Sequence, residues 1–293
     1  FERMGPHHLA REFFAQTAAS FPFSYYSILA LSQLPSAQSF RTNQGTVCFE
    51  PLICEGNATT HPHFEKFCLL EHLRLSELAL REWPAAKEEL GESSGLWWRQ
   101  VVLRHLLGER MQVSRILRDR LNSCLLRADP RLPELFWRIA YPLDFDDIIK
   151  KYCSIRGLDV HFVLGLICQE SYFQANAVSS AGATGLMQLM PQTARRLAAK
   201  VGLSYSAAKL SDPEYNIALG TAYLRELLDE FAGDSVLVLA AYNAGESRAQ
   251  AWDAEFGGEV DVFIEHIPFR ETRLFVKRVQ QNAAAYRRLF PDL

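Results

Sequence analysis

The segment DVHFVLGLICQES, residues 159–171, decides the fold. Asp159 is a residue type that caps helix N-termini, and the residues after it are apolar on nearly every side of a helix. Such a helix has no broad face for solvent, so we expect it to be buried in the core of a helical domain. Its far end carries one carboxylate, that of Glu170.

The place of Glu170 at the end of an apolar helix has a chemical consequence. Burial raises the pKa of a carboxyl group, and the negative end of the helix dipole acts in the same direction. A carboxyl group that stays protonated near neutral pH is what a general acid requires. The alternative is a glutamate at a helix end whose side chain simply reaches solvent.

A loop of small residues, SSAGATGLMQ at residues 179–188, follows the acid. A ligand can approach such a backbone closely, and its glycines permit unusual φ angles. Pro191 then suits the first turn of another helix. Gln188 is a candidate for hydrogen bonding to a polar ligand, whereas Met187 and Met190 can serve either as core residues or as ligand contacts.

Two later motifs carry further candidates. AYNAG, residues 241–245, ends an apolar helix at Gly245. Tyr242 in this motif can hold a carboxyl group or a sugar hydroxyl, or it can be a buried tyrosine that donates to a carbonyl. Glu271, in IPFRETR at residues 267–273, lies near a helix start, where an acid is usually a partner of the helix dipole or half of an ion pair.

The remaining sequence is dominated by the helical period, which predicts an all-α protein. Composition changes after Pro142, so we place a domain boundary near residues 140–143, and residues 35–63 read as a long loop or interdomain segment. The expected helices lie near residues 7–20, 23–34, 64–82, 84–91, 95–107, 109–127, 131–140, 144–156, 160–170, 191–201, 212–231, 234–243, 246–256 and 268–289.

Composition excludes several classes of protein. The chain has 293 residues, of which 48% are hydrophobic and 22% charged, as in ordinary globular proteins. The longest apolar runs fall far short of the ~18 residues that a membrane span needs, so we expect no transmembrane segment. The net charge of −3 lacks the basic excess of a nucleic-acid-binding protein, so we expect no nucleic-acid partner.

Six cysteines are present, and none forms a CxxC pair. Cys153 and Cys168 lie on apolar helix faces and are expected to be core residues. A disulfide among the other four is an open possibility in an oxidising compartment. A zinc site could be drawn from His61, His63 and cysteines, but the spacing fits no standard site, so the sequence predicts no metal and no cofactor. The other four cysteines are Cys48, Cys54, Cys68 and Cys124.

The sequence resembles a known family over residues 141–293. The run QESYFQANAVSSAGATGLMQLMPQTA at residues 169–194 is similar to the catalytic signature of the family 1 soluble lytic transglycosylases of bacterial cell walls. AYNAG, and IPFRETRLFVKRV at residues 267–279, resemble later motifs of that family in the same order. The resemblance implies a lysozyme-like catalytic domain, and one departure is Cys168, where the family often has a polar residue.

The resemblance also implies an activity. Such an enzyme cleaves the β-1,4 bond between N-acetylmuramic acid and N-acetylglucosamine in peptidoglycan without water and leaves a 1,6-anhydromuramyl product. Glu170 falls on the catalytic glutamate. We place Asn243, next to Tyr242 in its motif, among the substrate-binding residues with those onto which the family's glycan contacts map: Ser179, Gln188, Met190, Tyr242 and Glu271.

Other inferences rest on the same resemblance. It implies glycan strands of peptidoglycan as the partner and the periplasm as the location. Two alternatives stay open: a muramidase that resembles goose-type lysozyme, in which water attacks, and a non-catalytic scaffold that binds glycan.

The first half resembles the large members of the family more loosely. FPFSYYSILA, residues 21–30, is similar to a segment near the end of their helical superhelix, and the helices that follow resemble their linker domain. Because the chain begins at Phe1, we expect a mature or truncated piece. The expected domains are residues 1–63, with the end of the superhelix and a loop, residues 64–141 as linker, and residues 142–293 as the catalytic domain.

Overall fold

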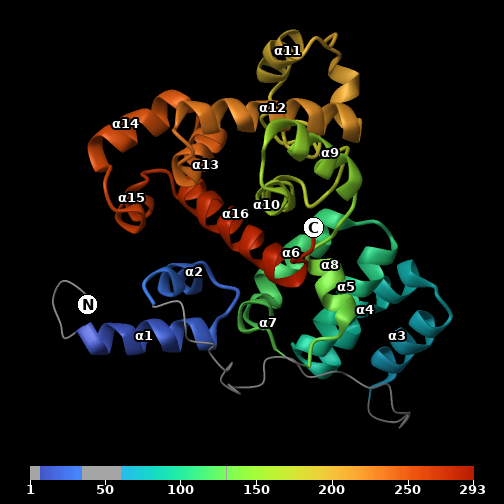
Figure 1. Cartoon of the computed structure of the whole chain (residues 1–293). Coiled ribbons are helices and arrows are strands. Elements are labelled where there is room, and N and C mark those ends of the chain that lie inside the picture. The colour runs from blue at the N-terminus through green and yellow to red at the C-terminus, as the bar shows by residue number, and fades with distance from the viewer. Residues whose placement is uncertain (1–6, 35–60, 130) are drawn as a thin grey trace. The chain divides into compact units, whose positions relative to one another are not determined.

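The structure is a computed structural model that describes residues 7–34, 61–129 and 131–293. The chain divides into two compact units, residues 1–140 and 141–293 (Figure 1). Over the described residues the all-α prediction is confirmed, because the β-pairing there consists of isolated bridges that join Thr184 to Val178 and Leu189. None of the described helices is both long and apolar enough to cross a membrane.

The first unit is built from short helices that follow one another along the chain. Neighbours in sequence pack together, most extensively α3 against α4. These helices are α1 (His7–Ser20), α2 (Tyr25–Ser32), α3 (Pro62–His72), α4 (Ser76–Leu90), α5 (Ser94–Leu106), α6 (Arg110–Arg120), α7 (Asn122–Arg127) and α8 (Glu134–Ala140).

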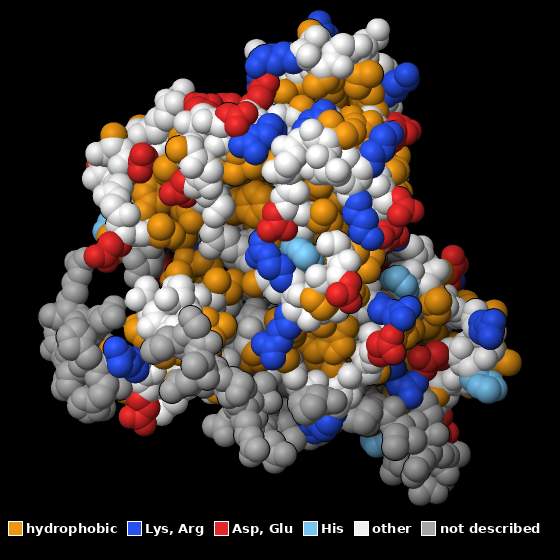
Figure 2. Space-filling view, in the orientation of Figure 1, with side chains coloured by type: hydrophobic (Ala, Val, Ile, Leu, Met, Phe, Trp, Pro, Cys, Tyr) orange, Lys and Arg blue, Asp and Glu red, His pale blue; other side chains and the backbone are white. Residues whose placement is uncertain are grey.

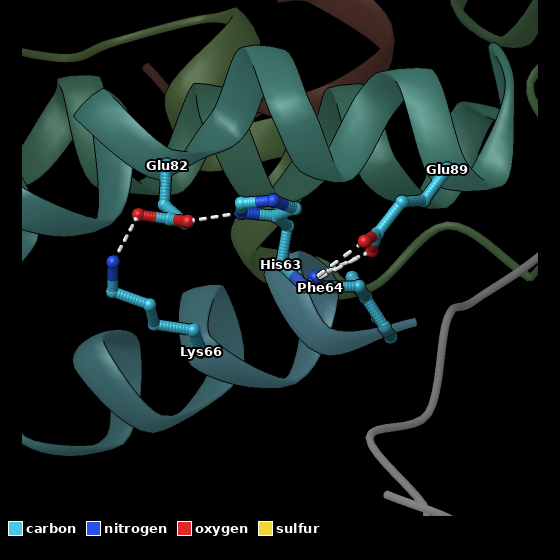
Figure 3. Close-up of polar contacts among 5 residues, drawn as sticks. All are labelled: His63, Phe64, Lys66, Glu82 and Glu89. Atoms are coloured by element: carbon cyan, nitrogen blue, oxygen red, sulfur yellow. Dashed lines mark hydrogen bonds and ion pairs between the residues drawn. The ribbon is translucent and has the colours of Figure 1, made fainter. Parts of the chain in front are cut away.

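Polar side chains of α4 hold the start of α3 (Figure 3). The carboxylate of Glu89 accepts hydrogen bonds from the backbone N–H of His63, at 3.1 Å, and of Phe64, at 3.0 Å. These N–H groups belong to the first turn of α3 and have no partner within the helix. Glu82 contacts the imidazole of His63 and pairs with Lys66 at 2.8 Å. The backbone and side chain of His63 therefore both bind carboxylates. In the described parts of the chain, no group of three His, Cys, Asp or Glu side chains is placed to hold a metal ion.

One helix boundary of the first unit was predicted wrongly. The expected division at residue 83 does not occur, because α4 runs through Pro84 and the chain turns instead at Arg74, whose φ is 59°. Proline usually ends a helix because it lacks an N–H donor. Here the buried face continues on both sides of the proline and holds the helix together, through Ala79, Trp83 and Ala86.

Other boundaries also differ from the expectation. The single helix expected over residues 109–127 is two, because the chain turns at Leu121, which is fully buried. In the second unit, the short helix α15 (Val260–His266) and a 3₁₀ turn (Ala207–Ser211) were not predicted, since five to seven residues are too few to establish a period.

Of the loop expected over residues 35–63, residues 35–60 lie outside the described residues, with Cys48 and Cys54 among them, whereas Pro62 and His63 already belong to α3. Cys68 is disulfide-bonded. Cys124, Cys153 and Cys168 are buried thiols, so the disulfide left open for Cys124 is not formed. Burial raises the pKa of the Cys168 thiol to about 12.

The second unit places the central helix where the sequence predicted it. α10 packs along α16, and α13 also contacts α16 (Figure 1). The elements of this unit are α9 (Asp146–Arg156), α10 (Val160–Glu170), α11 (Pro191–Lys200), the 3₁₀ turn (Ala207–Ser211), α12 (Pro213–Glu230), α13 (Ser235–Ala244), α14 (Glu246–Phe256), α15 (Val260–His266) and α16 (Arg270–Leu289).

A glycine sets the close approach of α10 and α16. A Cβ at Gly165 would lie 2.7 Å from the backbone nitrogen of Ala283 and 2.9 Å from the carbonyl oxygen of Val279. Those distances are shorter than nonbonded atoms allow. The two helices can therefore pack this closely only because residue 165 is a glycine and has no side chain. This contact places the end of α10, and with it Glu170, alongside α16.

Candidate active site

Glu170 is the last residue of α10, as the sequence predicted. The side chain of Asp159 caps the helix by accepting from the N–H groups of His161, at 2.8 Å, and Phe162, at 3.3 Å. The next turns of the helix are buried, and Glu170 is its half-buried last residue. Burial, with a smaller contribution from the charge of Glu271, raises the pKa of Glu170 to about 8. At neutral pH this carboxyl group is mostly protonated and can donate a proton.

The loop after Glu170 is held by its own side chains. The hydroxyl of Ser179 accepts from the N–H of Ala183 at 3.0 Å. The amide nitrogen of Gln188 donates to the carbonyls of Gly185, at 2.8 Å, and Ala177, at 3.1 Å. The Gln188 side chain, which is predicted to hydrogen-bond a polar ligand, therefore also shapes the loop through its amide nitrogen.

Three residues near the acid adopt left-handed backbone conformations. Tyr172, Phe173 and Gln188 have φ angles of 49°, 59° and 45°. For residues with a side chain, this conformation is unfavourable by ~1–2 kcal/mol each. Both aromatic residues are buried, which offsets the strain through packing.

Tyr242 lies at the end of α13 and within electrostatic reach of Glu170. Burial and the charge of Glu170 raise the pKa of Tyr242. Its hydroxyl donates to the carbonyl oxygen of Met187 at 2.7 Å, and its ring centroid lies 5.2 Å from that of Tyr223. The structure therefore shows Tyr242 as a tyrosine whose hydroxyl donates to a backbone carbonyl, in a position where it also interacts electrostatically with Glu170.

Asn243 is oriented by α16. The buried hydroxyl of Thr272 donates to the amide oxygen of Asn243 at 2.7 Å, which leaves the amide nitrogen of Asn243 to donate elsewhere. Glu271 precedes Thr272, is exposed, and acts on Glu170 through its charge. Met190 is 43% exposed at the N-cap of α11. The structure thus brings Tyr242 and Glu271 to Glu170, whereas no described contact joins Ser179 or Met190 to it.

Asn216 was not among the residues predicted from the sequence. Its amide group, fully buried on α12, makes three hydrogen bonds to the backbone around the small-residue loop. A Cβ at Gly185, whose φ is +86°, would lie 2.2 Å from this amide, so the loop approaches Asn216 as closely as a glycine allows. An asparagine inside the apolar run YNIALG, residues 215–220, was the signal that could have identified it.

A cavity of about 570 Å³ lies among α11, α12 and α14. Figure 2 shows basic side chains over α11 and acidic ones over the neighbouring part of α12. Arg196 and Lys200 both pair with Glu226 at 2.6 Å, and the lining also carries the carboxylates of Asp229, Glu230 and Glu246. The cavity touches the candidate site only indirectly, through Glu246, which accepts from the hydroxyl of Tyr223 at 3.0 Å.

Comparison with known proteins identifies the domain around this site. Residues 147–261 match the family described as "Transglycosylase SLT domain". The soluble lytic murein transglycosylase of Escherichia coli is 37% identical over 156 residues, which cover 52% of this chain and 24% of that protein. The chain thus spans about a quarter of the length of this curated relative.

Solved structures agree with the fold. The 70 kDa soluble lytic transglycosylase of Escherichia coli aligns over 98% of this chain and 44% of its own, with a TM-score of 0.66 and 23% identity. An inactive mutant of the lytic transglycosylase Slt of Pseudomonas aeruginosa aligns over 94% of this chain and 43% of its own, with a TM-score of 0.63 and 26% identity. These matches confirm the predicted fold class and family resemblance. The second unit of the chain therefore carries a transglycosylase SLT domain and is homologous to the soluble lytic murein transglycosylases.

Proposed function

We propose that the chain is a lytic transglycosylase that cleaves the β-1,4 bond between N-acetylmuramic acid and N-acetylglucosamine in peptidoglycan. The observation that carries this proposal is Glu170, a carboxyl group at the end of a buried helix with a pKa raised to about 8. The homology of the surrounding domain to murein transglycosylases supports the choice of substrate.

One acid suffices for the proposed reaction. Protonated Glu170 gives its proton to the glycosidic oxygen as the bond from that oxygen to C1 of the muramyl residue breaks. The resulting carboxylate then takes the proton of the muramyl C6 hydroxyl while the C6 oxygen bonds to C1. The product is a 1,6-anhydro sugar, Glu170 is protonated again, and no water is consumed.

The proposed substrate contacts come from the loop after this acid, from the end of α13 and from the start of α16. We assign glycan binding to Ser179, Gln188, Met190, Tyr242, Asn243 and Glu271. The half-exposed thioether of Met190 can pack on a sugar face, and the amide nitrogen of Asn243 can donate to a sugar oxygen. The hydroxyl of Tyr242 donates a hydrogen bond to the carbonyl oxygen of Met187, so the phenol oxygen is suited to accept a hydrogen bond from the substrate or from protonated Glu170.

A peptidoglycan substrate also implies a location. We propose that the chain acts in the periplasm of a bacterium, where murein transglycosylases meet their substrate. We further propose that residues 1–63, 64–141 and 142–293 are, respectively, the end of a superhelix with a loop, a linker domain and the catalytic domain.

The products of digested sacculi test the proposed reaction. Purified peptidoglycan sacculi are incubated with the protein, and the soluble products are analysed by mass spectrometry, with the Glu170→Gln variant as control. Anhydromuramyl ends from the wild type alone support the proposal. Reducing ends would instead indicate a muramidase, for which Glu271 is the nearby carboxylate that could activate water. Binding without cleavage would indicate a scaffold.

A further inference from the structure

Asn216 is a buried polar residue for which the proposed reaction has no use. It lies in the first turn and a half of α12 and is completely shielded from solvent. Its amide oxygen accepts from the N–H of Met187 at 2.8 Å, and its amide nitrogen donates to the carbonyls of Leu210, at 2.8 Å, and Thr184, at 3.0 Å. Both amide donors and the amide oxygen therefore bind backbone groups, and burial keeps the side chain away from a ligand.

One of these bonds fixes a peptide plane next to the acid. The N–H of Met187 and the C=O of Leu186 belong to the same planar trans peptide and point in opposite directions. Asn216 holds the N–H edge, and the hydroxyl of Ser171 donates to the C=O edge at 2.8 Å. Because Ser171 directly follows Glu170, this plane is tied on one side to α12 and on the other to the end of α10.

The side chain of Met187 is held by the same helix. A Cβ at Gly220 would lie 2.3 Å from the sulfur and 2.7 Å from the Cβ of Met187. Gly220 lies four residues after Asn216, so both face the loop from one side of α12. Met187 is thus fixed through its N–H and through its side chain, each by a residue of α12.

The carbonyl of Met187 completes the connection. It accepts the hydroxyl proton of Tyr242 at 2.7 Å, so the direction of this carbonyl decides where the phenol oxygen lies. Tyr242 is also the tyrosine whose pKa responds to the charge of Glu170. The segment Leu186–Met187 therefore links the acid to the tyrosine beside it, and Asn216 determines how that segment is oriented.

We propose that Asn216 is a positioning residue for the transglycosylase reaction: through Leu186–Met187 it sets the place of the Tyr242 hydroxyl relative to Glu170. This inference rests on the proposed function. It predicts that a change at Asn216 lowers turnover only when the Tyr242 hydroxyl is present. A residue that only stabilises the fold would lower turnover whether or not that hydroxyl is present.

A double-mutant cycle tests this dependence. Asn216→Ala removes all three hydrogen bonds, whereas Asn216→Asp keeps the shape and an oxygen for the Met187 N–H but loses the amide donor. Thr221→Val is the matched control, because Thr221 is equally buried on α12 and donates only to carbonyls of its own helix. Each change is made alone and with Tyr242→Phe, and kcat and KM are measured on glycan strands after a thermal melt has verified folding.

We expect a graded loss of kcat with KM nearly unchanged. Asn216→Ala lowers kcat by ~10–100-fold, as small displacements of a site residue do, Asn216→Asp lowers it less, and Thr221→Val leaves it unchanged. In the Tyr242→Phe background the same changes at Asn216 alter kcat by at most about 2-fold, since the hydroxyl that they displace is already absent.

Three results would overturn the positioning role. They are an equal loss of kcat in both backgrounds, an unchanged kcat in the Asn216 variants, and failure of both variants to fold when Thr221→Val folds. Failure of the proposed function is recognised separately, because the wild-type protein would then release no anhydromuramyl products at all.

Discussion

Glu170 at the end of α10 and Glu271 at the start of α16 form a pair of carboxyl groups in which one is half-buried and the other exposed. Burial of Glu170, together with the charge of Glu271, raises the pKa of Glu170 to about 8. At neutral pH Glu170 is therefore mostly protonated and can hold the proton needed for catalysis.

Activity should fall as Glu170 loses its proton. We expect kcat to decline above about pH 8, the pKa of Glu170. Glu271→Gln removes a negative charge that favours the protonated form, so the alkaline limb of the pH profile should move to lower pH. Glu255→Gln makes the same change of charge on α14, at a carboxylate that does not act on Glu170, and should leave the limb in place. Superimposable profiles for wild type and Glu271→Gln would contradict the coupling.

Glu170→Gln should abolish turnover and preserve the fold. Glutamine has nearly the same shape as protonated glutamic acid, but it can neither give nor take the catalytic proton. Loss of a general acid–base group lowers rates by ~10²–10⁴-fold, and here one group serves both steps. Release of anhydromuramyl products from sacculi is the measurement, with circular dichroism as the control for folding. Turnover within a few-fold of wild type would remove Glu170 from the role.

The same substitution should change how stability depends on pH. The folded pKa of Glu170 lies above its value of 4.5 in an unfolded chain, so the folded state binds more protons between pH 4.5 and about 8. The stabilisation is complete below pH 4.5 and is lost as pH rises through that range, by up to ~1.4 kcal/mol per pH unit. Relative to Glu170→Gln, the free energy of unfolding of the wild type should therefore decline from pH 5 to 8. Parallel curves from denaturant titrations would show that the folded carboxyl titrates normally.

Tyr242→Phe should lower both rate and stability. The substitution removes the hydroxyl beside Glu170, for which we expect a loss of kcat between about ten-fold and a thousand-fold. It also leaves the buried carbonyl of Met187 without its donor, which costs ~1–3 kcal/mol in the free energy of unfolding. Tyr215→Phe is the matched control, since that hydroxyl donates to Ser204 at 3.0 Å and should affect stability alone. A normal rate in Tyr242→Phe would make Tyr242 a purely structural residue.

A fragment of residues 141–293 should fold by itself and keep some activity. This range is one of the two compact units, and it contains Glu170 and every residue assigned to glycan binding. A cooperative thermal melt and the release of anhydromuramyl products from sacculi are the measurements. A fragment that cannot fold would show that the second unit depends on the first.

The position of Glu170 at the end of a buried helix could be predicted from local sequence, because all the residues that indicate it lie within one helix. The cap at Asp159, the apolar residues after it and the position of Glu170 are neighbours in sequence, and the structure places them as expected. The path of α4 through Pro84 was not predictable in this way. It depends on burial of Ala79 and Ala86 against other helices, which the local pattern does not reveal.

The environment of the acid was harder to predict than the acid itself. Nothing in the sequence indicated that the amide nitrogen of Gln188 donates to carbonyls of its own loop, a contact that depends on the left-handed turn at that residue. Asn216 lies 46 positions after Glu170 in sequence, and nothing in its local pattern tells which backbone it will meet. The resemblance to a family located the motifs, whereas the contacts between motifs required the folded chain.

The left-handed conformations of Tyr172, Phe173 and Gln188 limit how this chemistry could be moved to another scaffold. A peptide that spans residues 169–190 would relax, because it would lose the burial of Tyr172 and Phe173 that offsets their strain in the folded domain. A graft that also carried α12 would bring Asn216 and Gly220, which hold the segment from outside. For a protein engineer, the smallest transplantable unit is therefore the acid and its loop together with the helix that faces them.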